Sequence, residues 1–169
     1  MKKSSKKAMT KASLLNWISA VLGIVAVVML FLPFLSAEAL GKTETVNGLS
    51  VIFGNEDKGL AFSFMNFLTL LLVLGGIALA VLSALKGNKL ASYGATLCLL
   101  LAGIFFFCGL NFFTLVIEEG TPDKFVDGAY ELARELYDLG VGAIIAGICS
   151  ILAAISAVGS TVIDKLLKK

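Results

Sequence analysis

The chain has 169 residues, of which 58% are hydrophobic and 15% are charged, and its mean hydropathy is +0.94. Water-soluble domains contain about 45–50% apolar and about 25% charged residues, so this composition excludes an ordinary soluble domain. The chain has no histidine, and four of its long segments contain no charged residue. Ionisable residues at membrane depth usually mark proton and ion routes, so their absence argues against proton-coupled transport and intramembrane catalysis.

Each charge-free segment is long enough to cross a bilayer. The segments are Ala12–Ala37, Gly59–Leu85, Leu90–Ile117 and Leu139–Ile163, with 26, 27, 28 and 25 residues. A helix needs about 20 apolar residues to cross a hydrocarbon core about 30 Å thick. We therefore predict an all-α membrane protein, a single domain built on a four-transmembrane-helix bundle. The predicted spans are residues 13–35, 62–85, 91–117 and 141–162, with a tail at 1–12 and outer segments at 36–60 and 118–140.

The charges of the loops predict the orientation. The two termini and the short loop after the second span carry ten cations and one acid, a net +9. The other two segments carry four cations and eleven acids, a net −7. Because short segments rich in Lys and Arg stay cytoplasmic, we expect both termini inside and segments 36–60 and 118–140 outside. The five lysines before Ala12 either contact anionic inner-leaflet lipids or only fix this orientation.

Two interpretations of the first apolar segment are open. A basic tail, an apolar run and the sequence SAEA at Ser36–Ala39 resemble a secretory signal peptide with its cleavage site. The apolar core of such a peptide has about 7–15 residues, whereas Leu14–Leu35 has 22. The length favours an uncleaved first span.

The first outer segment contains a candidate hairpin. Asn47-Gly48 lies between two β-prone runs, and Asn-Gly is the preferred pair for a two-residue type I′ turn. We predict a small extracellular β-hairpin after the first span that turns at Asn47-Gly48 and pairs Val46 with Leu49.

The nearby triplet Gly41-Lys42-Thr43 resembles the end of a phosphate-binding loop. That motif needs an earlier glycine, where this chain has Ser36, and it needs a strand before it and a helix after it. The charge count also places the triplet outside. We therefore expect no nucleotide site.

The second outer segment predicts an amphipathic extracellular helix between the third and fourth spans. Thr121 suits the N-cap, Pro122 the first helical position and Asp123 the first turn. One apolar stripe follows at helical spacing, and acids with Arg134 fill the opposite face. The stripe consists of Phe125, Val126, Ala129, Leu132, Ala133 and Leu136. We expect the helix to lie on the outer surface and to stop or bend near Gly140.

Small residues predict where helices approach closely. They recur every four positions on the fourth span, and a similar face lies on the second span. The faces comprise Gly142, Ala146, Ser150 and Ala154, and Gly76 and Ala80. In lipid, small residues let helix backbones come together, so we expect packing within the bundle, with dimerisation as the alternative. We expect the three cysteines, all within spans, to be packing residues.

Three asparagines fall in the apolar segments. Asn66 and Asn111 lie at similar depth from the outer ends of the second and third spans, which predicts an inter-helix hydrogen bond. The alternative is a polar lining of an outer vestibule or pore. Asn16, near the inner interface, is expected to meet headgroups or to cap the helix.

These features favour a protein without enzymatic activity. We predict no catalytic residue, cofactor, metal, nucleotide or nucleic-acid partner, and we interpret the outer acids as a solvated surface. The main hypothesis is a scaffold or accessory subunit in contact with the lipid bilayer and with an unidentified membrane or envelope protein. The alternative is a homo-oligomeric channel or small transporter subunit. The predicted partner surface comprises Asn47, Gly48, Val51, Phe53, Phe125, Leu132 and Leu136.

The order of these parts resembles a broad group of small four-span bacterial membrane proteins of uncharacterised function. The shared features are a span that ends in LPFLSAEALG (32–41), an outer segment with NGLSVIFG (47–54) and three further spans with a minimal inner loop. Many members carry an N-terminal zinc ribbon, which this sequence lacks. The resemblance implies a bacterial cytoplasmic membrane. The layout alone also looks like the claudin and peripheral-myelin-protein tetraspans, but segment 36–60 lacks their Trp and paired Cys, so a tight-junction function is not implied.

Overall fold

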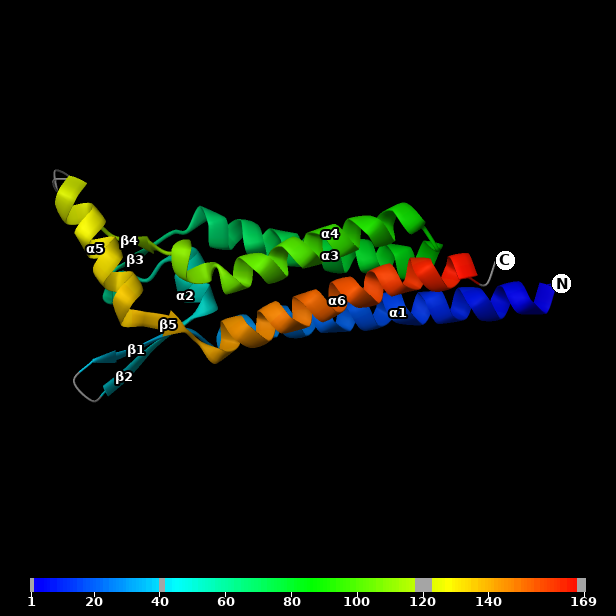
Figure 1. The fold of residues 1–169 in the computed structure, drawn as a ribbon, viewed down its shortest axis with the longest axis horizontal. Coiled ribbons are helices and arrows are strands. Elements are labelled where there is room, and N and C mark those ends of the chain that lie inside the picture. Colours follow the sequence, from blue (N-terminus) through cyan, green and yellow to red (C-terminus); the bar gives the residue numbers. More distant parts are fainter. Residues whose placement is uncertain (1, 40–41, 118–122, 167–169) are drawn as a thin grey trace.

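The computed structural model describes residues 2–39, 42–117 and 123–166. Four long helices run side by side along the long axis of the molecule (Figure 1). They are α1 (Lys2–Val28), α3 (Phe64–Lys86), α4 (Lys89–Phe107) and α6 (Val141–Leu166). Each contributes to an apolar stretch of 19 to 23 residues that is long enough to cross a membrane. The prediction of four membrane-crossing helices is therefore confirmed at the level of length and composition.

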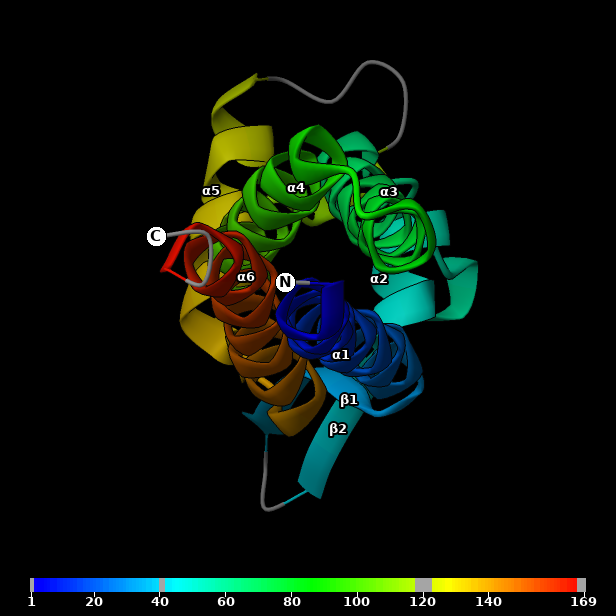
Figure 2. The ribbon, with the colours of Figure 1, turned by 90° about the vertical axis from the view of Figure 1, so that its right-hand side faces the viewer.

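The bundle has two different ends. In cross-section α1 packs against α3 and α6, and α4 packs against the same two helices (Figure 2). The start of α1, the last turns of α6 and the α3–α4 connection lie at one end, which we call the terminal end (Figure 1). The strands, the short helix α2 (Gly48–Phe53) and α5 (Asp123–Leu136) lie at the other, which we call the strand end.

The first span leads directly into the central strand of a sheet. α1 ends in one 3-10 turn, η1 (Met29–Phe31), and Leu32 is extended, as expected for a residue before proline. β1 (Pro33–Ala39) starts there and pairs antiparallel with β2 (Lys42–Asn47) and β5 (Tyr137–Leu139), in the order β2-β1-β5. The residues after the first span and those before the last are thereby joined through one sheet.

A small hairpin follows the first span as predicted, but its turn is not at Asn47-Gly48. The hairpin is formed by β1 and β2, with Leu35 opposite Val46. The pairing of Val46 with Leu49 was wrong, because Leu49 lies in α2.

The Asn-Gly pair has a different role. The Asn47 side chain caps α2, since its Oδ1 accepts a hydrogen bond of 2.8 Å from the Ser50 amide. Gly48 is the first residue of α2, and a Cβ there would lie 2.8 Å from Leu30 Cδ2 and 3.0 Å from the Leu30 carbonyl oxygen. Glycine is needed here for close packing and not for a positive φ.

α4 is shorter than the predicted third span. It ends at Phe107 instead of Ile117 and is followed by η3 (Gly109–Asn111) and β4 (Thr114–Leu115), which pairs with β3 (Leu60–Ala61). A Cβ at Gly109 would lie 2.7 Å from Phe34 Cε1, so the chain packs tightly against β1 at this point. The apolar run continues past the helix because an apolar segment can be a strand as well as a helix.

The helix between the third and fourth spans is present, but it ends earlier than predicted. α5 ends at Leu136, and Tyr137–Leu139 forms β5 on the edge of β1. The helix therefore ends where backbone pairing with β1 begins, before the predicted end near Gly140. The predicted cap at Thr121 and Pro122 lies outside the described residues.

One apolar core runs from the bundle into the strand end. Ala26, Val73 and Leu99 in the bundle belong to the same buried cluster as residues of the sheet and of α2. The strand-end members include Phe34, Leu35, Val46, Val51, Ile52, Leu60, Phe113 and Ala133. The strand end and the bundle therefore share one continuous apolar core.

The predicted small-residue faces lie inside the bundle. All six residues (Gly142, Ala146, Ser150 and Ala154 on α6, Gly76 and Ala80 on α3) are buried. A Cβ at Gly142 would lie 2.7 Å from the Met29 carbonyl oxygen of the first span, and one at Gly76 would lie 2.6 Å from Leu99 Cγ of α4. The faces are used for contacts between helices of one chain.

We predict that Gly142→Ala destabilises the protein by about 1–3 kcal/mol. The added methyl group meets the backbone carbonyls of Met29 and Pro33, which cannot move aside as a flexible side chain would. The matched control is Gly75→Ala, since nothing lies within 4 Å of a Cβ at Gly75 and Ala favours a helix over Gly. Thermal unfolding of both variants in one detergent provides the measurement. Equal stability would contradict the close approach of the first and fourth spans.

Candidate functional site

The candidate site is a row of apolar side chains on α5 that the other described residues leave uncovered. With 3.6 residues per turn, Val126, Tyr130 and Ala133 share one face of α5, which we call the docked row. Phe125, Ala129, Leu132 and Leu136 share the neighbouring face, which we call the uncovered row. The stripe predicted from the sequence is therefore divided into two rows with different surroundings.

The docked row holds α5 to the strand end. The ring of Phe113 lies 6.1 Å from that of Tyr130 and 6.3 Å from that of Tyr137, between centroids, which is the range of favourable aromatic pairs. The Leu115 amide donates a hydrogen bond of 3.1 Å to the Tyr130 hydroxyl oxygen. Ala133 is buried. These contacts fix the rotation of α5 about its own axis.

The uncovered row faces away from the protein. Phe125 is 72% exposed, Leu132 57% and Leu136 47%, and Ala129 is exposed as well. Burying one such large apolar side chain against a partner would contribute about 1.5–3 kcal/mol to the free energy of binding. Exposed apolar residues are common singly, but a contiguous group marks a surface for another molecule.

Acidic side chains dominate the strand end. Eight acids are exposed: Glu38, Glu44, Glu56, Asp57, Asp127, Glu131, Glu135 and Asp138. Among the side chains that the structure describes at this end, Lys58 and Arg134 are the cations. On α5, Glu135 lies beside the uncovered row, on the side away from the docked row, and Glu131 lies on the opposite face of the helix with Asp127 and Arg134. The row is thus apolar at its centre and negative at its free edge.

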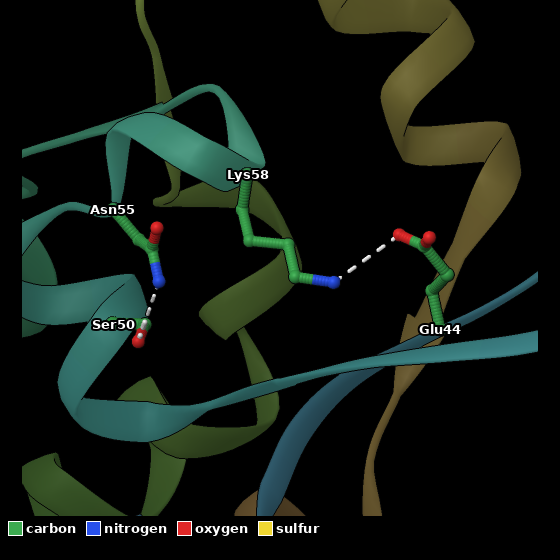
Figure 3. A network of polar contacts seen from close by, with 4 residues as sticks. All are labelled: Glu44, Ser50, Asn55 and Lys58. Atoms are coloured by element: carbon green, nitrogen blue, oxygen red, sulfur yellow. Dashed lines mark hydrogen bonds and ion pairs between the residues drawn. The ribbon is translucent and has the colours of Figure 1, made fainter.

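Polar contacts hold the turn η2 (Glu56–Lys58) against the hairpin and α2 (Figure 3). Lys58 Nζ lies 3.3 Å from Glu44 Oε2 of β2, and Asn55 Nδ2 donates a hydrogen bond of 3.4 Å to Ser50 Oγ of α2. An exposed ion pair contributes about 0–1 kcal/mol. The contacts therefore orient the turn more than they stabilise the protein.

The predicted partner surface is only partly exposed. Phe53, Phe125, Leu132 and Leu136 are exposed, and so is Asn47, although its side chain caps α2. Gly48 and Val51 are buried, which corrects the prediction for both. They face the core because the chain forms a helix at Gly48 instead of the tip of a hairpin.

Asn66 and Asn111 are not joined by a hydrogen bond. Asn66 is buried and its Nδ2 donates to Ser63 Oγ at 3.0 Å, while its Oδ1 has no partner. Asn111 is exposed, in η3. The ends of the second and third spans are instead connected by Ser63 Oγ, which donates to the Phe112 carbonyl. The predicted hydrogen bond assumed that Asn66 and Asn111 lie at similar depths within two helical spans. This assumption was wrong because α4 ends before Asn111.

The main buried polar cluster lies at the terminal end and centres on Asn16. Asn16 Nδ2 donates a hydrogen bond of 3.0 Å to Ser83 Oγ of α3. Its Oδ1 lies 3.2 Å from Ser92 Oγ of α4 and 3.2 Å from Ser160 Oγ of α6. The two hydroxyls also lie 2.7 Å from the Ala157 carbonyl oxygen. One side chain of α1 thus contacts all three other helices, which corrects the expectation that Asn16 meets headgroups or a cap.

The sequence contained a signal for this cluster. Ser83 and Ser92 stand at similar distances on either side of the short α3–α4 connection. Asn16 lies four residues after the start of the first apolar stretch at Ala12, and Ser160 lies three residues before the end of the last one at Ile163. The similarity in depth that relates Asn66 to Asn111 in the sequence relates these four residues as well, once serines are included.

Comparison with known proteins adds no relative. No family model matches the chain, and no curated protein is significantly similar to it. The resemblance to four-span bacterial proteins stays a prediction.

We predict that Asn16→Leu destabilises the protein by about 0.6–2 kcal/mol, the range for polar contacts between helices in membranes. Leucine has a similar size but cannot bond to Ser83, Ser92 or Ser160. The matched control is Asn111→Leu, which removes an exposed amide and should leave stability nearly unchanged. Thermal unfolding in one detergent compares the two variants. A larger loss for Asn111→Leu would show that the outer asparagine, and not Asn16, connects the helices.

Proposed function

We propose that this chain is a non-enzymatic integral protein of a bacterial cytoplasmic membrane and acts as a scaffold or accessory subunit. In this proposal the four helices hold the strand end at the outer face, and the hairpin and α5 present a surface to a partner. The observation that carries the proposal is the uncovered row of α5, which stands on an otherwise well-packed strand end.

Support comes from the rigid connection between this surface and the bundle. β1 follows the first span directly, and the Gly140 amide, next to the fourth span, donates a hydrogen bond of 2.7 Å to the Phe34 carbonyl. α5 is in turn fixed by the docked row against Phe113. A partner bound at α5 would therefore be held in a defined position relative to the membrane.

The distribution of charge supports the proposed sidedness. The α3–α4 connection is flanked by Lys86 and Lys89 and lies at the terminal end, together with the lysine-rich first turns of α1. The exposed acids lie at the strand end. Because Lys and Arg are retained in the cytoplasm, this arrangement favours a cytoplasmic terminal end and an outer strand end.

The packing favours the scaffold over a homo-oligomeric channel. A channel was expected to use the small faces of α3 and α6 together with Asn66 and Asn111. The small faces are buried in contacts within one chain, and Asn66 is buried beside Ser63. Of the residues expected to line a pore, Asn111 is exposed, whereas Asn66 and the small faces are not presented to a second copy.

Thiol labelling tests the sidedness. We expect Glu38→Cys to react with a membrane-impermeant maleimide in intact cells, because Glu38 is exposed on β1. Lys86→Cys, which is exposed at the end of α3, should react only after the cells are permeabilised. The parent chain measures the background from its three native cysteines. The reverse labelling pattern would invert the proposed orientation.

Crosslinking in cells tests the scaffold function itself. A photoreactive residue at Leu132 or Glu38 should give a discrete adduct with one partner, whereas the same residue at Lys86 should not give that adduct. The purified protein in liposomes should show no ion flux. A closed ring of copies that conducts ions would replace the scaffold by the channel.

A further inference from the structure

We propose that the uncovered row of α5 binds a basic amphipathic helix of a partner protein. The inference rests on the scaffold function proposed above and specifies the chemistry of the partner. It is drawn from the spacing of the row, from the way α5 is held and from the charges beside it.

The spacing matches the contact seam of two packed helices. Phe125, Ala129, Leu132 and Leu136 follow one another in steps of four, three and four residues. This is the alternation of a and d positions by which one helix inserts its side chains between those of another. Ala129 is small and lets a partner helix approach closely at the middle of the seam. A partner helix therefore fits the seam best, because its side chains repeat with the same spacing as those of the seam.

The docked row makes this seam available without rearrangement. Tyr130 is held by the Leu115 amide and by the ring of Phe113, so the face that carries Leu132 cannot rotate toward the protein. A surface held in its binding conformation loses less entropy when a partner binds. The seam covers residues 125–136, about 17 Å at 1.5 Å per residue, which suits a short and reversible contact.

The charges beside the seam discriminate among the molecules that could bind there. Glu135 borders the seam, Glu131 lies one turn before it on the polar face of α5, and segments 36–60 and 118–140 carry a net −7 in the sequence. A second copy bound at the same face would bring two acidic surfaces together, and like charges across an interface are unfavourable. Anionic lipid is disfavoured for the same reason. A helix with Lys or Arg beside its apolar seam satisfies both the row and its acidic edge.

Peptide binding to the full-length protein tests the inference. The probes are two fluorescent peptides of about three heptads with the same leucine seam, one flanked by Lys and one by Glu. The protein is held in nanodiscs of zwitterionic lipid. We expect saturable binding of the Lys peptide, binding of the Glu peptide that is weaker by about tenfold or more, and an affinity that falls as salt is added.

Variants locate the binding surface. Leu132→Ser combined with Leu136→Ser should weaken binding of the Lys peptide by about tenfold or more, because the seam loses two apolar side chains. Glu131→Gln combined with Glu135→Gln should reduce the salt dependence. The matched control is Val116→Ser, which changes another exposed apolar residue of the strand end and should leave binding unchanged. Equal binding by the serine double variant and the parent would overturn the inference.

A photocrosslinker at Ala129 distinguishes the occupants. Crosslinking to the Lys peptide, competed by unlabelled peptide, supports the inference. Crosslinking to a second copy or to lipid in its place would overturn it. The scaffold function has a separate readout: if the parent does not bind the Lys peptide but Glu38 crosslinks a discrete partner in cells, the helix proposal fails and the scaffold stands.

Discussion

The rest of the structure depends on the close contact between the start of the fourth span and the end of the first. The Gly140 amide donates to the Phe34 carbonyl at 2.7 Å, and a Cβ at Gly142 would lie 2.7 Å from the Met29 carbonyl oxygen. Only residues without a side chain allow these backbones to come so close. Because β1 leaves α1 and β5 enters α6 at this point, the contact also places the two strands side by side. The sheet, the hairpin and the attachment of α5 all follow from it.

The two ends of the bundle are held together by different kinds of interaction. At the strand end the ties are backbone contacts and an apolar core that includes Phe34, Leu35 and Phe113. At the terminal end one side chain, Asn16, bonds to serines of the three other helices. In lipid, helices gain little from the hydrophobic effect and associate through packing and polar contacts. Between the two ends, small residues such as Ala146 and Gly76 supply the packing.

The sequence predicts the elements whose physical causes are local, and it fails where the cause lies far along the chain. Apolar length identifies four spans, and helical spacing identifies α5. The use of Asn47-Gly48 could not be predicted locally, because it depends on Leu30 occupying the space next to Gly48. The division of the α5 stripe into two rows likewise depends on Phe113 and Leu115, which come from another segment. The end of α4 at Phe107 was missed because apolarity alone does not separate a strand from a helix.

The meaning of an exposed apolar side chain differs between the two parts of this molecule. Residues such as Leu97 and Ile155 are exposed on the four long helices, which are long and apolar enough to cross a membrane, where lipid would cover them without a protein partner. α5 lies outside these four stretches, and apolar surface left in water costs about 25 cal/mol for each Å². The fold already packs Tyr130 of the same helix against Phe113 and buries Ala133, yet it leaves Phe125, Leu132 and Leu136 uncovered. One half of the apolar stripe of α5 packs against the strand end of the same chain. The other half is exposed, so α5 is oriented for a second contact with another molecule.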